Sequence, residues 1–183
     1  MSHSQSEFTV LRQTIATRGT VRMALLPITI IGWTATTVAL LHLRDAPFSF
    51  AYPLISLMVL VGGFEAIHAL HVGVERIGRY LQVYYEGQPD GPRWETTVMP
   101  LGPALPGGGI DPMFTVVFVA ASMLNLASVF LDGPTLTEGL VVGALHALVW
   151  GRIIRARGAA ARQRAVDLET FRAIKSGQDE TSA

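Results

Sequence analysis

Residues 50–74 read FAYPLISLMVLVGGFEAIHALHVGV, an unbroken apolar run whose only charged residue is Glu65. An α-helix rises about 1.5 Å per residue, so about 20 apolar residues cross a hydrocarbon core that is about 30 Å thick. Backbone amides inside lipid must find partners within the chain, and a continuous run lacks the alternation of a barrel strand. The stretch therefore predicts a transmembrane α-helix.

Three other apolar runs approach the same length, at about residues 23–41, 113–131 and 136–154. Charged residues make up 15% of the 183 residues, whereas a soluble domain usually carries about 25%. The sequence thus predicts an all-α integral membrane protein, folded as a four-transmembrane-helix bundle.

The basic residues are distributed very unevenly around these runs. Of the 14 lysines and arginines, all but Arg44 precede the first run, separate the second from the third, or lie at and beyond the end of the fourth. Because basic residues favour the cytoplasmic side of a membrane, both termini are predicted to be cytoplasmic. We expect a bacterial-type inner membrane.

The segments outside the runs have distinct compositions. Apolar residues recur at helical spacing within residues 1–22, which predicts an amphipathic surface helix. Residues 23–155 form the predicted membrane domain, and their cytoplasmic loop over 86–112 is rich in proline and glycine. Residues 156–183 predict a basic C-terminal helix and tail, with a break at Gly158.

Several kinds of chemistry are excluded or disfavoured. The chain contains no cysteine, which excludes disulfides, thiolate metal sites, iron–sulfur clusters and cysteine nucleophiles. The glycines at 107–109 are followed by no lysine, so they do not form a phosphate-binding loop. We therefore expect a protein that is not an enzyme, and basic residues that set the topology rather than bind nucleic acid.

A polar stripe follows one face of the second run. On a helix, this face and its flank carry Glu65, His68, His71, Glu75, Arg76 and Arg79. Glu65 is predicted near the middle of the bilayer, where a carboxylate must be paired or sheltered by protein. Asn125 and His146 are polar residues at a similar predicted depth, so a buried layer of Glu65, His68, Asn125 and His146 is geometrically allowed. Glu75 is expected to pair with Arg76 and Arg79.

Three functional interpretations of these residues stay open. In the first, Glu65, His68, Glu75, Asn125 and His146 line a pathway for protons or cations. A buried carboxyl beside histidines suits this role, because both groups exchange protons near neutral pH.

The other two interpretations involve a cofactor, although nothing in the sequence requires one. Glu65, His68, His71 and His146 are candidate ligands for a divalent metal, since positions i and i+3 share a helical face. Only one Glu-x-x-His unit is present, which counts against a di-iron centre. Alternatively, His146 with His68 or His71 ligates haem b.

A further interpretation is structural, because polar residues in membrane helices also serve simply to bond one helix to another. Gly139 and Gly143 would let the fourth run approach a neighbouring helix closely. Under this interpretation the chain is a non-catalytic accessory or assembly subunit of a larger membrane complex, or a homo-oligomer, surrounded by lipid bilayer.

Overall fold

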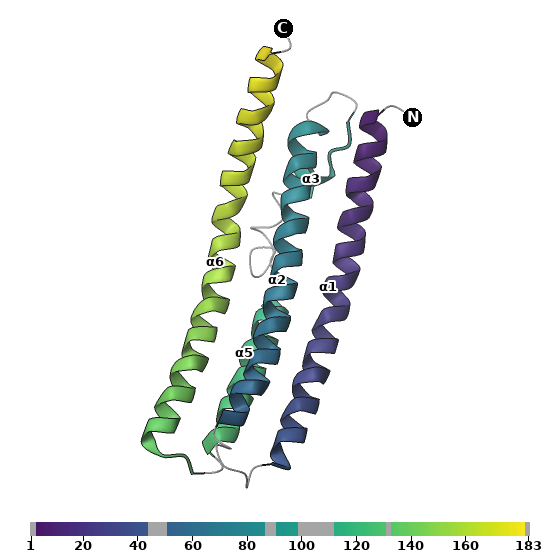
Figure 1. Cartoon of the computed structure of the whole chain (residues 1–183). Helices are drawn as coiled ribbons and strands as arrows, with labels where there is room; N and C mark the ends of the chain where they lie inside the picture. The colour runs from purple at the N-terminus through teal and green to yellow at the C-terminus, as the bar shows by residue number, and fades with distance from the viewer. Residues whose placement is uncertain (1–2, 44–50, 87–90, 99–111, 131–132, 182–183) are drawn as a thin grey trace. The chain divides into compact units, whose positions relative to one another are not determined.

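The computed structural model describes residues 3–43, 51–86, 91–98, 112–130 and 133–181 (Figure 1). Within these ranges the chain forms helices and no strand, as the sequence predicts. The elements are α1 (His3–Leu41), α2 (Tyr52–Tyr84), α3 (Trp94–Val98), α5 (Pro112–Phe130) and α6 (Leu136–Thr181).

Three segments of the described chain are long and apolar enough to cross a membrane. They are Ser4–Leu41, Tyr52–Tyr84 and Leu136–Ala156. The stretch Phe114–Phe130 of α5 is also apolar but is shorter than these. Within the described residues the prediction of a helical chain with helices that could cross a membrane is thus confirmed, whereas the number of four spans stays a prediction.

The chain divides into two compact units. One unit contains residues 23–68 and 111–156, and we call it the apolar unit. The other contains residues 1–22, 69–110 and 157–183, and we call it the charged unit. The divisions fall close to the ends of the runs that the sequence predicts to span the membrane.

Two predictions about helix ends are corrected. Residues 3–22 are not a separate helix, because α1 continues without interruption from His3 to Leu41. Likewise α6 passes through Gly158, where a break was predicted. A glycine costs a helix only about 1 kcal/mol relative to alanine. The three alanines that follow Gly158 favour helix and help offset this cost.

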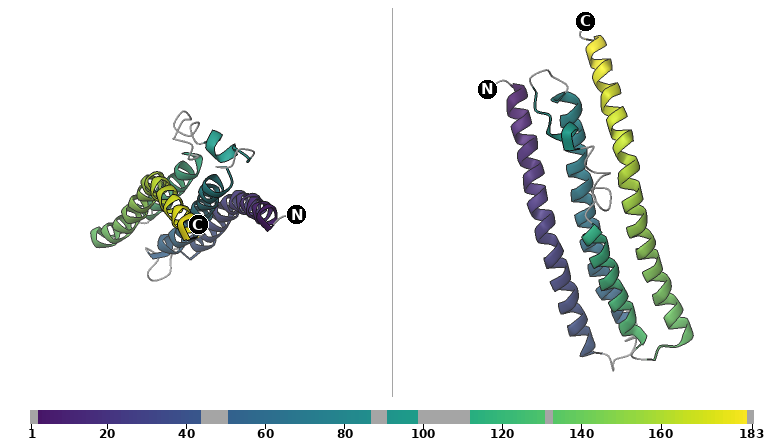
Figure 2. Two further views of the ribbon diagram at one scale, coloured as in Figure 1. Left: turned by 90° about the horizontal axis from the view of Figure 1, so that it is seen from above. Right: turned by 180° about the vertical axis from the view of Figure 1, so that it is seen from behind.

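Successive helices of the apolar unit run antiparallel to one another (Figures 1 and 2). Its core is a cluster of the buried residues Leu60, Ile67, Phe118, Ala121 and Ile153. Helices α1 and α2 approach each other closely at a glycine, since a Cβ atom added to Gly63 would overlap the side chain of Thr29. This contact leaves no room for a larger residue at position 63.

The charged unit combines the buried aliphatic residues Leu81 and Leu168 with a group of aromatic rings that contact one another. The rings of Tyr80 and Tyr84 stack with their centroids 4.6 Å apart, and Phe171 of α6 meets Tyr80 edge-on at 5.7 Å. Phe8 of α1 lies 5.4 Å from Tyr85. Burial, together with a hydrogen bond to Glu7, raises the pKa of Tyr85 to about 12. Its hydroxyl therefore remains protonated at any physiological pH.

Candidate functional site

A buried asparagine joins the four helices of the apolar unit. The side-chain amide nitrogen of Asn125 on α5 donates to the Pro53 carbonyl of α2 at 2.7 Å and lies 3.1 Å from Nε2 of His146 on α6. Nε1 of Trp33 on α1 donates to its amide oxygen at 3.2 Å. Asn125 and His146 are almost fully buried. We call Trp33, Asn125 and His146, with the Pro53 carbonyl, the asparagine node.

The node fixes which nitrogen of His146 carries the proton. An amide NH₂ group only donates, so Nε2 of His146 must accept from Asn125. Nδ1 is then the protonated nitrogen, and it donates to the carbonyl of Val142 at 2.8 Å. Because a neutral imidazole has a single lone-pair nitrogen, this arrangement leaves none for a metal or haem iron. The geometry speaks against His146 as a ligand.

Glu65 does not belong to this node, so the predicted layer is wrong in that respect. Its Oε2 accepts a hydrogen bond from Nη2 of Arg152 at 2.7 Å. Glu65 lies 12 residues beyond Pro53 on α2, a rise of about 18 Å at 1.5 Å per residue. The ends of the apolar runs locate each polar residue along its helix only approximately, so they do not show which residues lie level with one another.

The Glu65–Arg152 ion pair lies near one end of the apolar unit and is partly open. The side chains are 41% and 46% exposed, respectively. Glu65 is about one turn before His68, and Arg152 about one turn before Ala156, where their helices leave the unit. Sequence reasoning missed this pair, because Arg152 was counted only as a topological signal.

The remaining histidines of the stripe lie in different surroundings. The ring of His68 stacks on Phe64, with centroids 5.9 Å apart. In the charged unit, Nδ1 of His71 is 3.0 Å from Nη1 of Arg22. Since a guanidinium only donates, this nitrogen uses its lone pair to accept. Across the described ranges, no three carboxylate or imidazole side chains gather as a metal site would require.

A network of ion pairs connects α2 and α6 within the charged unit. Arg79 donates to Asp167 at 2.7 Å and to Glu75 at 2.9 Å, and Arg164 donates to Glu75 at 3.1 Å. Arg76 lies 3.7 Å from Asp167. The Glu75–Arg79 pair confirms the prediction from their spacing of four residues, whereas Arg164 and Asp167 were missed. We call these five residues the ionic network.

The centre of the ionic network is buried. The side chains of Arg79 and Asp167 are 6% and 9% exposed, respectively. Burial alone would raise the pKa of Asp167, but hydrogen bonds from Gln163 and Arg79 and the positive charge of the guanidiniums outweigh it. The net effect holds the pKa of Asp167 below its ordinary value, so the carboxylate is charged at neutral pH.

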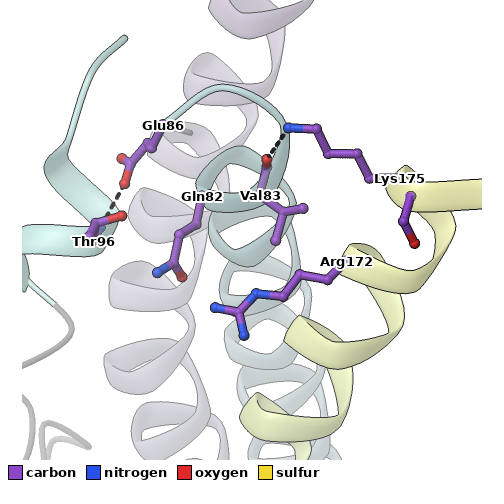
Figure 3. A pocket seen from close by; sticks show the side chains of 7 residues that line it. Gln82, Val83, Glu86, Thr96, Arg172 and Lys175 are labelled. Carbon is purple, nitrogen blue, oxygen red and sulfur yellow. Dashed lines mark hydrogen bonds between the residues drawn. The ribbon is translucent and has the colours of Figure 1, made fainter. Parts of the chain in front are cut away.

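An open cavity of about 500 Å³ lies in the charged unit (Figure 3). It is lined by Gln82, Val83, Glu86, Thr96, Arg172, Lys175 and Ser176. Lys175 already has a partner within the chain, because its Nζ donates a hydrogen bond to the Val83 carbonyl at 2.9 Å. The carboxylate of Glu86 also has partners within the chain, since its oxygens accept hydrogen bonds from the backbone amides of Glu95 and Thr96.

The side chains of Gln82 and Arg172 in this cavity are available to bind a group from outside. Gln82 on α2 and Arg172 on α6 point toward one another (Figure 3). Among the described residues, neither side chain has a hydrogen-bond or ion-pair partner. The cavity therefore offers a guanidinium and an amide to a polar group from outside, which the sequence did not reveal.

Comparisons with protein families, with curated proteins and with solved structures give no match to this chain.

Proposed function

We propose that this protein is a non-catalytic membrane subunit that holds a partner protein at the cytoplasmic face of a bacterial-type inner membrane. In this proposal the apolar unit crosses the bilayer four times and both termini are cytoplasmic. The observation that carries the proposal is that the charged groups of the polar stripe are bonded to other groups of the same chain.

The placement in lipid is supported by the outward-facing side chains of the apolar unit. Large apolar residues are strongly exposed on each of its helices, among them Ile31 of α1, Met58 of α2, Leu124 of α5 and Leu148 of α6. Exposing apolar surface to water costs about 25 cal/mol per Å². Lipid removes that cost, and the exposed residues on α5 argue that this helix crosses the bilayer as well.

The internal bonding of the stripe favours a structural role over ion handling. A pathway needs a carboxylate that can exchange its partner for a proton or a cation. Glu65 is already neutralised by Arg152, and Glu75 accepts from both Arg79 and Arg164. These bonds resemble those that fix helices against one another, at about 0.6 kcal/mol per interaction inside a membrane.

The cavity in the charged unit supplies a contact for the partner. A guanidinium binds a carboxylate through two parallel hydrogen bonds, and this geometry is specific. We therefore propose that an acidic side chain of the partner binds Arg172, with Gln82 donating to the same carboxylate. Arg172 is exposed and Gln82 is partly exposed, and both line an open cavity, so this contact is accessible from the aqueous side.

Site-specific photo-crosslinking in intact cells tests the proposal. A photoreactive amino acid at position 82 should give one discrete adduct, and Arg172→Glu in the same chain should abolish it. The matched control carries the photoreactive residue at Val10, an exposed position elsewhere in the charged unit. An adduct of the mass of two copies would identify the homo-oligomer instead, and no adduct at position 82 would refute the proposal.

A flux assay distinguishes the ion-handling hypothesis from this one. The purified protein in proteoliposomes should carry no proton or cation current above that of empty vesicles. If it does carry one, and Glu65→Gln removes it, then ion handling replaces the subunit proposal. An absorption spectrum and metal analysis of the same sample test the haem and metal hypotheses.

A further inference from the structure

A small hollow lies beside the Glu65–Arg152 pair on the surface of the apolar unit. Its volume is about 180 Å³. It is lined by Val61, Phe64 and Glu65 from α2 and by Leu148, Val149, Arg152 and Ile153 from α6. Apart from the ion pair, every lining side chain is apolar.

The polar and apolar parts of this hollow are arranged along the helices. Helices α2 and α6 run in the same direction within the apolar unit (Figure 1). Val61 therefore lies one turn before Glu65, and Leu148 lies one turn before Arg152, both toward the middle of the predicted spans. The ion pair occupies the end of the hollow that is nearer to the cytoplasmic side in the predicted topology. A phospholipid has the same order, with its acyl chain toward the bilayer centre and its charges at the surface.

The ion pair has bonding capacity that the protein does not use. Nη2 of Arg152 donates to Oε2 of Glu65, and no other hydrogen bond of either side chain is present among the described residues. A guanidinium has five N–H groups and a carboxylate has about four acceptor sites. Both side chains are nearly half exposed, so a polar group from outside can reach them.

The charges specify the kind of headgroup. Arg152 suits a phosphate, which it can bind through two parallel hydrogen bonds. Glu65 lies beside it and would repel a headgroup that carries only negative charge. A headgroup with a phosphate and a primary ammonium satisfies both side chains, since the ammonium donates to Glu65. A quaternary ammonium such as choline has no N–H group to donate.

We infer that this hollow binds phosphatidylethanolamine, with its phosphate on Arg152, its ammonium on Glu65 and part of one acyl chain against Val61 and Leu148. The inference depends on the placement of the apolar unit in a bilayer, and it is independent of the partner protein and of the cavity at Arg172. The lipid shields the ion pair, because its own charges replace the water that hydrocarbon cannot supply.

Native mass spectrometry of the delipidated protein in detergent tests the inference. Phosphatidylethanolamine, phosphatidylcholine and phosphatidylglycerol with identical acyl chains are added separately. The first should bind about tenfold more tightly than the second, a factor that corresponds to about 1.4 kcal/mol. Equal binding of these two lipids by the wild-type protein would overturn the inference, and so would a preference for phosphatidylglycerol.

Variants assign the headgroup contacts. Glu65→Gln should bring phosphatidylethanolamine down to the affinity of phosphatidylcholine, and Arg152→Gln should weaken all three lipids. Arg155→Gln is the matched control, because Arg155 is exposed on α6 outside the hollow, and it should change nothing. Leu148→Trp fills the hollow from its exposed side and should abolish lipid binding. This variant changes no charged residue, so it tests the inference even if the charge variants do not fold. Retained binding in that variant would overturn the inference.

Discussion

Two adjacent glycines on α2 test the packing of the apolar unit, because replacing them with alanine should change its stability in opposite directions. A Cβ atom at Gly63 would overlap Cγ2 and Oγ1 of Thr29 and lie 2.7 Å from its Cβ. At Gly62, by contrast, an added Cβ would meet nothing within 4 Å. Replacing each glycine with alanine therefore makes the same chemical change in two different environments.

The structure sets the size of the two effects. Alanine in place of glycine stabilises a helix by about 0.5–1 kcal/mol, so Gly62→Ala should raise the stability slightly. Gly63→Ala has the same helical gain but also overpacks the α1–α2 contact, which typically costs about 1–3 kcal/mol. Because the helical term is common to both variants, their difference measures the overlap alone. We expect Gly63→Ala to be less stable than Gly62→Ala by about 1–3 kcal/mol.

Thermal or denaturant unfolding in one detergent measures this difference. A third variant identifies the neighbour: Thr29→Ala removes both Cγ2 and Oγ1, so it should relieve part of the penalty in Gly63→Ala. The relief appears as a coupling energy in a double-mutant cycle. Equal stability of Gly62→Ala and Gly63→Ala would refute the close packing of α1 on α2.

Three further predictions concern the ionic network and the asparagine node. Asp167→Asn should lower the free energy of local opening of α6 in the charged unit by about 2–3 kcal/mol, since it weakens the buried ion pair with Arg79 while Arg79 keeps its bond to Glu75. Hydrogen exchange measures this free energy, and Glu169→Gln is the control at an exposed position. Equal exchange in the two variants would contradict the prediction. The pKa of Asp167 is lowered in the folded state. The stabilisation that its charged carboxylate gives to the folded state should therefore be complete above the ordinary aspartate pKa of 3.8, and it should vanish as the pH falls through the lower folded-state pKa. Hydrogen exchange across that pH range should show this loss in the wild type and not in Asp167→Asn. Asn125→Ala should cost about 1–3 kcal/mol for each buried partner left unpaired, chiefly His146, and an unchanged unfolding midpoint would argue against the node.

Features that depend on neighbouring residues of one helix were predictable from the sequence. The apolar runs predicted the helices because length and composition are local properties. The Glu75–Arg79 pair was predictable for the same reason, since residues four apart meet on one helix. Gly158 misled the prediction, because a local breaker was given more weight than the alanines that follow it.

Contacts between helices were predicted only where the sequence left few alternatives. Asn125 and His146 are isolated polar residues in apolar runs, so their proximity could be anticipated. The partner of Glu65 could not, because it depends on how far α2 is shifted along α6. That shift is set by packing, and no local pattern encodes which of several arginines lies level with Glu65. The same holds for Asp167.

The asparagine node has a consequence for how α5 finds its place during biogenesis. Between Phe114 and Phe130 this helix carries no charged residue, so in the proposed four-span topology a rotation or shift of α5 would change its solvation by lipid little. Asn125 removes this degeneracy, because only one rotation and one depth bring its amide to Pro53, His146 and Trp33 together. If α5 crosses the bilayer as proposed, a shifted or rotated helix would leave this amide without partners in hydrocarbon. Asn125 therefore restricts the rotation and depth of α5 in the apolar unit, together with the buried Ser122, whose hydroxyl accepts a hydrogen bond from Trp150 of α6 at 3.0 Å.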